Sequence, residues 1–183
     1  MPATESVGGS LAVFDYGGAV ATAIVRFKYA GRSDLAERFS AIMAAASTLA
    51  TREVDLVVPV PLHPRRLVER GFDQAALLGA PIARRLGIAH APRALLRTRA
   101  TAPQASLDRD TRSANVANAF RCAAPRDIAG QRVLLVDDVR TTGATLSACA
   151  EALRAAGAAD VRSLVLATRN REEKSTKLQA VRD

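Results

Sequence analysis

Two adjacent acids, Asp137 and Asp138, precede a short run of small and hydroxyl-bearing residues. The run consists of Thr141, Thr142, Gly143, Ala144 and Thr145. Hydroxyl and backbone N–H donors that converge without bulky side chains suit a phosphate monoester. The acids repel a phosphate, but as neighbours they suit two vicinal hydroxyls, each donating a hydrogen bond to one carboxylate. The pattern predicts a ribose 5-phosphate site; the alternative is an ordinary strand-to-helix turn with two solvated acids.

The segments on either side of this run are those that such a site needs. The apolar stretch 133–136 is typical of a strand buried on both faces of a parallel sheet. Leu146, Cys149 and Leu153 recur at helical spacing and predict a helix directly afterwards. The run therefore lies between the carboxyl end of a strand and the N-terminus of a helix, where the helix dipole favours an anion.

A second site-forming segment is predicted at residues 55–62, which we expect to be the first buried strand. Two prolines at its carboxyl end force the chain to turn there. Ligands bind at the carboxyl ends of strands in open α/β sheets, so the arginines that follow are expected to face a polyphosphate. The residues assigned to this side are Pro59, Val60, Pro61, Arg65, Arg66 and Arg70. His63 could act as a general acid or base, although a lone histidine is more often a structural hydrogen-bonding group.

The remaining segments complete an α/β pattern. Two helices are predicted within residues 10–52, where they could form a flap that brings Lys28 and Tyr29 to an anionic or planar part of a substrate. The alternatives are solvation for Lys28 and packing for Tyr29. A helix is expected at 72–86 and strands at 94–97 and 161–167, the last closing the sheet. Residues 97–120 are polar and aperiodic, which favours a lid that keeps water from the site.

Composition indicates one enzyme-sized domain. The 183 residues carry a net charge of +8, and residues 59–107 hold eight arginines but only two acids. That window suits a polyphosphate or, alternatively, a nucleic-acid surface, although Arg84 and Arg85 are expected merely to solvate a helix face. Two cysteines without metal spacing, no apolar segment of membrane-spanning length and no export signal predict a soluble cytoplasmic protein.

The order of the motifs resembles a known family. Pro-Val-Pro-Leu-His is followed by Arg-x-x-Glu-Arg-Gly-Phe-x-Gln, Arg-x-Arg-x-Thr-x-x-Gln, Arg-x-x-Asn and Val-Asp-Asp-Val-x-Thr-Thr-Gly-Ala-Thr. This series, from about Phe14 to Leu166, resembles the ComF family of type I phosphoribosyltransferase-like proteins. The resemblance implies a type I phosphoribosyltransferase fold, with a central, mostly parallel sheet flanked by helices, a small N-terminal flap and a flexible lid loop. It also implies one domain over 1–168, with N-terminal helices at 10–52 and a core at 53–168, before a charged tail at 169–183.

Site roles follow from the same resemblance. Asp137 and Asp138, taken as the catalytic pair, would hold the ribose hydroxyls of phosphoribosyl pyrophosphate, and the following loop its 5-phosphate. The arginines after residue 62 form the pyrophosphate side, and Lys28 and Tyr29 belong to the flap. The lid positions are Arg97, Arg99, Thr101, Gln104, Arg112 and Asn115, and Gln74 is a further position shared with the family.

The chain also departs from the family pattern at three places. Family members often begin with a four-cysteine zinc module, whereas no cysteine precedes Cys122 here, so zinc is not implied. Asp73 stands where asparagine is common, and an acid there would repel pyrophosphate unless it faced Arg70 or a metal. Arg140 occupies a position that is often aliphatic.

The resemblance implies transfer of a 5-phosphoribosyl group to a nitrogen acceptor, a nucleobase or an amine. Mg²⁺ would be bound through the substrate, with Asp137 and Asp138 as the only protein ligands considered, because magnesium needs few protein ligands beside phosphate oxygens and water. A homo-oligomer is expected. The alternative function is that of a non-catalytic accessory protein in competence or DNA uptake, which binds phosphoribosyl pyrophosphate or a nucleotide and has nucleic-acid or protein partners.

Overall fold

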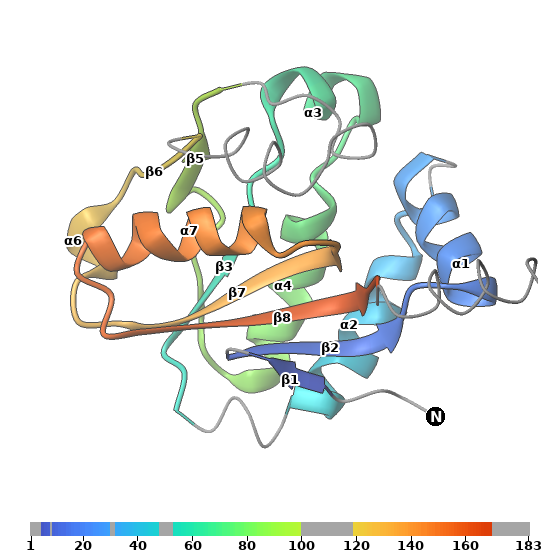
Figure 1. Cartoon of the computed structure of the whole chain (residues 1–183), viewed down its shortest axis with the longest axis horizontal. Coiled ribbons are helices and arrows are strands. Elements are labelled where there is room, and N and C mark those ends of the chain that lie inside the picture. The colour runs from blue at the N-terminus through green and yellow to red at the C-terminus, as the bar shows by residue number, and fades with distance from the viewer. Residues whose placement is uncertain (1–4, 8, 30–31, 48–52, 100–118, 170–183) are drawn as a thin grey trace, which may run out of the picture.

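A six-stranded sheet forms the centre of the computed structural model, which describes residues 5–7, 9–29, 32–47, 53–99 and 119–169 (Figure 1). The strand order is β1-β2-β8-β7-β3-β4, in which β1 is antiparallel to β2 and the other five strands are parallel. The strands are β1 Glu5–Val7, β2 Ser10–Asp15, β3 Leu56–Pro59, β4 Ala89–His90, β7 Arg132–Arg140 and β8 Asp160–Thr168.

Helices cover both faces of this sheet (Figure 1). The helix α7 packs on one face together with a separate two-stranded antiparallel sheet of β5 and β6, and α1, α2 and α4 pack on the other. The helices are α1 Gly18–Tyr29, α2 Leu35–Ser47, α3 Pro64–Arg70, α4 Gln74–Leu86, α6 Pro125–Ile128 and α7 Ala144–Ala155, and the small sheet pairs β5 Leu95–Arg97 with β6 Phe120–Cys122. None of these helices is both long and apolar enough to cross a membrane.

The core depends on β7, whose four apolar residues point alternately to the two faces of the sheet. Val133 and Leu135 belong to the cluster under α7, whereas Leu134 and Val136 belong to the cluster under α1, α2 and α4. All four are at most 2% exposed. The prediction of a strand buried on both faces is therefore confirmed, and this double burial explains its unbroken apolar pattern.

Two predictions about the sheet are wrong. Residues 55–62 do not form the first buried strand, because β2 precedes them and is buried from Ser10 to Val13. The strand predicted at 161–167 does not close the sheet, because β8 lies between β7 and β2. The cause of both errors is the pairing of β2 with β8, which joins segments from opposite ends of the chain.

The helix predicted at 72–86 is confirmed as α4, which ends at Gly87 with the left-handed backbone that favours glycine (φ 68°). The strand predicted at 94–97 exists as β5, but it pairs with β6 outside the main sheet. The short helix α3 was not predicted.

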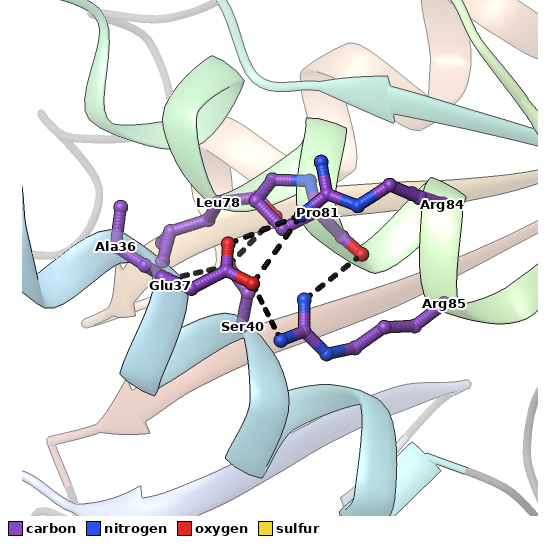
Figure 2. A network of polar contacts seen from close by, with 7 residues as sticks. All are labelled: Ala36, Glu37, Ser40, Leu78, Pro81, Arg84 and Arg85. Carbon is purple, nitrogen blue, oxygen red and sulfur yellow. Dashed lines mark hydrogen bonds and ion pairs between the residues drawn. The ribbon is translucent and has the colours of Figure 1, made fainter.

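The contact between α2 and α4 is polar as well as apolar (Figure 2). The buried Ser40 hydroxyl lies 2.6 Å from the Ala36 carbonyl oxygen and 3.0 Å from the Leu78 carbonyl oxygen. Glu37 accepts hydrogen bonds from Arg84 at 3.2 Å and from Arg85 at 2.6 Å. Both arginines are thus ion-paired across two helices, rather than merely solvating one.

We expect Ser40→Ala to lower the free energy of unfolding by about 1 kcal/mol, because a buried hydroxyl that bridges two helices is lost. The midpoint of thermal unfolding should fall by about 2 to 4 °C for a chain of this length. Ser147→Ala on the exposed side of α7 is the matched control, since it makes the same change of helix propensity without a buried contact. Equal effects of the two changes would contradict the assignment.

Candidate functional site

The sequence-predicted acids lie at the carboxyl edge of the parallel sheet, near the end of β7. Successive side chains of a strand point to opposite faces, so Asp138 follows Val136 toward α1 and Asp137 follows Leu135 toward α7. The two carboxylates are therefore adjacent in sequence but leave the strand on different sides. A ligand held by both must lie across the end of β7.

Asp138 is bound by the flap helix. Lys28 Nζ lies 2.9 Å from Asp138 Oδ2, and the Asp138 side chain is 10% exposed. The preceding residue, Phe27, is fully buried and its ring packs edge-on against Phe39, with a tilted contact to Phe72. This aromatic anchor fixes the end of α1, so Lys28 reaches the site as an ion-pair partner rather than as a solvated side chain.

Asp137 lies in a less favourable electrostatic environment. Burial and, secondarily, the charge of Asp138 raise the pKa of Asp137 to about 8, while Lys28 acts in the opposite direction. Its Oδ1 accepts a hydrogen bond from the Asp138 backbone N–H at 2.8 Å. A carboxyl group with this pKa can hold or release a proton near neutral pH.

The loop after the acids leads directly into α7. Gly143 is the N-cap residue of this helix, with φ 82°, and it has no side chain to cap the N–H groups of the first turn. Thr142 Oγ1 accepts a hydrogen bond from the Ala144 N–H at 3.4 Å. The structure therefore brings the predicted loop residues Thr141 and Thr145 together with a helix N-terminus, an arrangement that favours anions.

The predicted turn after β3 contains two side chains that cap the helices α3 and α4. His63 is the N-cap residue of α3 and its Nδ1 accepts a hydrogen bond from the Arg65 N–H at 3.2 Å. Asp73 is the N-cap residue of α4 and accepts hydrogen bonds from the N–H groups of Leu62 and Ala76, at 3.0 and 3.1 Å. His63 thus has the structural role that was expected, and the Asp73 carboxylate faces backbone donors, which stabilise its charge.

Arg70 connects α3, on the predicted pyrophosphate side, to Tyr29 at the end of α1. One of its Nη groups donates to Gln74 Oε1 at 2.7 Å and the other to the Tyr29 hydroxyl oxygen at 2.9 Å. Its guanidinium also lies over the Tyr29 ring, 4.9 Å from the centroid. These partners are neutral, so they orient Arg70 without cancelling its charge. Tyr29 is 67% exposed, so it is not packed in the core.

Arg97 of β5 approaches the site from the α7 side. Its guanidinium lies 5.3 Å from the centroid of the Phe120 ring. Burial lowers the pKa of Arg97, as does the charge of Arg66, whereas Asp137 raises it. Arg66, Arg97 and Asp137 therefore share one electrostatic neighbourhood. Of the other predicted lid residues, Arg99 is exposed, and Thr101, Gln104, Arg112 and Asn115 lie outside the described residues.

The site offers few ligands for a metal ion. Among the described residues, no group of three or more histidine, cysteine, aspartate or glutamate side chains could hold one. The two carboxylates Asp137 and Asp138 remain, and this small oxygen set is compatible with Mg²⁺ that takes its other ligands from phosphate groups and water.

Sequence reasoning missed the contacts at the neighbouring strand ends. Arg140 Nε donates to Thr168 Oγ1 at 3.1 Å, and the guanidinium of Arg169 lies 4.6 Å from the centroid of the Tyr16 ring. The contact of Arg140 with Thr168 could have been predicted by assuming that β7 and β8 pair in parallel, since parallel pairing places their carboxyl ends side by side.

Comparison with known proteins gives consistent results. The family model for the phosphoribosyl transferase domain matches residues 73–182. The DNA utilization protein YhgH of Escherichia coli (strain K12) is 38% identical over 154 residues, which are 81% of this chain and 67% of the relative. Competence protein F of Haemophilus influenzae is 34% identical over 124 residues, covering 67% of this chain and 54% of the relative. Competence protein ComFC of Bacillus subtilis is 28% identical over 163 residues, covering 84% and 62%.

Among solved structures, a similar fold occurs in the glutamine phosphoribosylpyrophosphate amidotransferase from B. subtilis, with a TM-score of 0.51 and 22% identity over 76% of this chain. This chain covers only 30% of that protein, so the likeness concerns the fold alone. The type I phosphoribosyltransferase fold, predicted from the sequence, is thereby confirmed. Together with the family match and the competence relatives, it shows that the chain belongs to the phosphoribosyltransferase domain family, as a ComF-type member.

Proposed function

We propose that this chain binds phosphoribosyl pyrophosphate with Mg²⁺ and transfers its 5-phosphoribosyl group to a nitrogen acceptor. The observation that carries the proposal is the position of Asp137 and Asp138 at the end of a central strand, one short loop before a helix N-terminus whose N-cap residue, Gly143, has no side chain. Acceptors for hydroxyl groups and donors for a phosphate are thus available within one strand-loop-helix unit.

The parts of the substrate can be assigned from charge. The 5-phosphate would lie at the start of α7, in the loop 141–145, and the ribose hydroxyls would donate to Asp137 and Asp138. Lys28 contacts Oδ2 of Asp138, which leaves Oδ1 for a hydroxyl group. The pyrophosphate would extend toward β3 and α3, where Arg70 is held by neutral partners.

In the reaction, a lone pair on the acceptor nitrogen forms a bond to ribose C1. The bond between C1 and the pyrophosphate oxygen breaks, its electron pair leaves with pyrophosphate, and the proton lost by the acceptor passes to solvent. Mg²⁺, held by phosphate oxygens and by Asp137 or Asp138, would neutralise charge on the pyrophosphate. The arginines bind that group and the carboxylates orient the ribose, so the residues of the chain act mainly by positioning and charge neutralisation.

A second candidate function is supported by the names of the relatives, which describe a DNA utilization protein and competence proteins. In this role the chain would bind phosphoribosyl pyrophosphate or a nucleotide without turnover and would assist the use of DNA. A nucleic-acid surface would rely mainly on arginines other than Arg84 and Arg85, because Glu37 neutralises part of the charge of this pair.

Titration calorimetry with phosphoribosyl pyrophosphate and Mg²⁺ tests the first proposal. We expect the native chain to bind and Asp137→Asn/Asp138→Asn to lose at least about tenfold in affinity, because the charge-assisted hydrogen bond to Asp138 is weakened and the carboxyl group of Asp137 is lost. Asp127→Asn, on the exposed helix α6, is the control and should bind like the native chain. Absence of binding to the native chain would refute the proposal, and release of pyrophosphate with an acceptor would separate an enzyme from a binding protein.

The pKa of Asp137 predicts an unusual dependence of stability on pH. Because the pKa is raised on folding, the native chain binds more protons than the unfolded chain between about pH 4 and 8, and stability falls as the pH rises through this window. Asp137→Asn keeps an acceptor for the Asp138 N–H but removes the free-energy cost of ionising a buried carboxyl group. The melting temperature of the variant should therefore exceed that of the native chain by an amount that grows from pH 5 to pH 8.

The control for this prediction is Asp55→Asn, for which the opposite sign is expected. Hydrogen bonds from Arg132 lower the pKa of Asp55 to about 2. The contribution of the Asp55 carboxylate to the free energy of unfolding is therefore present at neutral pH and is lost as the pH falls from about 4 to 2. A pH-independent effect of Asp137→Asn, or equal signs for both variants, would contradict the assignment of the raised pKa.

Oligonucleotide binding tests the second candidate. If nucleic acid binds the arginine-rich window, the fluorescence anisotropy of a labelled single strand should show an affinity that falls steeply with salt. Arg65→Gln/Arg93→Gln, at exposed positions, should weaken binding more than Arg84→Gln/Arg85→Gln, because Glu37 already neutralises part of the latter pair. A native chain without measurable, salt-dependent binding would rule out this role for the window.

A further inference from the structure

The motif Arg-Gly-Phe-Asp-Gln at residues 70–74 forms a tight turn between α3 and α4. Gly71 ends α3 with the left-handed backbone that favours glycine (φ 78°). The ring of Phe72 contacts the buried ring of Phe27, and Asp73 is the N-cap residue of α4. These contacts fix the turn, so the first and last side chains of the motif are held close together although they belong to different helices.

Gln74, the last residue of the motif, holds the first. Gln74 is 3% exposed, and its Oε1 accepts a hydrogen bond from an Nη group of Arg70 at 2.7 Å. Its Nε2 donates to the Phe72 carbonyl oxygen at 3.3 Å, which turns the amide oxygen toward the arginine. A glutamate carboxylate at this position would repel the carbonyl oxygen and cancel the charge of the arginine, because an ionised carboxylate only accepts hydrogen bonds. Glutamine therefore orients the guanidinium without neutralising it.

Tyr29 restrains the same guanidinium from the end of α1. Its hydroxyl oxygen accepts a hydrogen bond from the other Nη group of Arg70 at 2.9 Å, and its ring centroid lies 4.9 Å from the guanidinium carbon. The two hydrogen bonds, to Gln74 and to Tyr29, use two of the five N–H donors of an arginine. The other three form no hydrogen bond with the described residues, so they remain for a ligand.

Two further contacts place this guanidinium near the acids. Lys28 pairs with Asp138, and the next residue of α1 contacts Arg70, so consecutive side chains reach the acid and the arginine. Besides burial and Asp138, the charge of Asp73 raises the pKa of Asp137, so the turn that follows Arg70 lies within electrostatic range of the second acid. Arg70 therefore lies beside the proposed ribose site, on the side of β3.

We propose that Gln74 and Tyr29 are positioning residues, which hold Arg70 in place for the pyrophosphate group of the donor substrate. The inference rests on the proposed function for the identity of this ligand. An arginine binds phosphate oxygens through parallel N–H groups, and a guanidinium that is ordered before binding loses less entropy when the complex forms. Both residues should thus affect pyrophosphate binding only through Arg70.

A double-mutant cycle measured by titration calorimetry tests this dependence. The ligands are phosphoribosyl pyrophosphate, inorganic pyrophosphate and ribose 5-phosphate, each with Mg²⁺. Gln74→Met removes the acceptor for Arg70 but keeps an unbranched side chain. We expect it to lower the affinity for the two ligands that contain pyrophosphate by about two- to tenfold, the range for ordering one long side chain on binding. The affinity for ribose 5-phosphate, which lacks this group, should not change.

The cycle is completed with Arg70→Met. This change alone should lower the affinity for both pyrophosphate-containing ligands by about tenfold or more, because charge-assisted hydrogen bonds are lost. In the Arg70→Met background, Gln74→Met should cause no further loss, since no guanidinium remains to be positioned. A merely structural role of Gln74 would instead lower the affinity by the same factor in both backgrounds.

Tyr29→Phe is an independent variant at an exposed position, 67% accessible in the native chain. It removes the hydroxyl acceptor and keeps the ring beside the guanidinium, so we expect a smaller loss, about twofold, again only where Arg70 is present. Gln131→Met, directly before β7 and thus at the opposite edge of the sheet, is the matched control and should bind all three ligands like the native chain. Melting temperatures of all variants verify folding.

The outcomes separate this inference from the proposed function. Losses that are equal with and without Arg70, losses that extend to ribose 5-phosphate, or native affinity in both Gln74→Met and Tyr29→Phe would overturn the positioning role even if phosphoribosyl pyrophosphate binds. Binding of inorganic pyrophosphate that depends on Gln74 only through Arg70, without binding of phosphoribosyl pyrophosphate, would support the inference and refute the phosphoribosyl transfer. A native chain that binds neither ligand would overturn both.

Discussion

Repulsion between Asp137 and Asp138 is the constraint on which the rest of the site depends. Two carboxylates at the end of a strand that is buried on both faces cannot both be ionised at low cost. The surroundings of the two carboxylates differ. Lys28 compensates the charge of Asp138, whereas burial and the neighbouring acid raise the pKa of Asp137. Arg97 also lies within electrostatic range of Asp137, because the Asp137 charge raises the pKa of Arg97.

This compensation requires that α1 be fixed in position. Lys28 follows Phe27, whose ring is buried among the rings of Phe39 and Phe72, so the hydrophobic core holds the lysine in place. The next residue, Tyr29, contacts Arg70 on the opposite side of the site. Consecutive residues at the end of one helix thus contact β7 and α3, and the position of the flap depends on aromatic packing as well as on charge.

The parts that the sequence predicts well are local. The strand 133–136, the loop 141–145 and the helix α7 follow from apolar periodicity and from residue types within one segment, and the helix α4 follows from its spacing and from Gly87. The place of β2 next to β8 and the ion pair of Lys28 with Asp138 join distant segments, and no local pattern specifies such pairings. The sequence could also have predicted the capping roles of His63 and Asp73, because both residues directly precede helices at positions where capping groups are preferred.

The described arginines differ in the groups that orient their side chains. Arg132, the first residue of β7, forms a bidentate pair with Asp55, and Arg84 and Arg85 share Glu37 between two helices, so their charges are used within the fold. Arg70 and Arg140 are oriented by neutral groups instead. An arginine that is positioned without being neutralised retains its electrostatic potential for a ligand, and it has lost part of its side-chain entropy before binding. Arg70 follows the carboxyl end of β3 and Arg140 is the last residue of β7, so both lie at the same edge of the sheet as the acids, whereas Arg154, whose Nη2 donates to the Val161 carbonyl oxygen, lies near the start of β8.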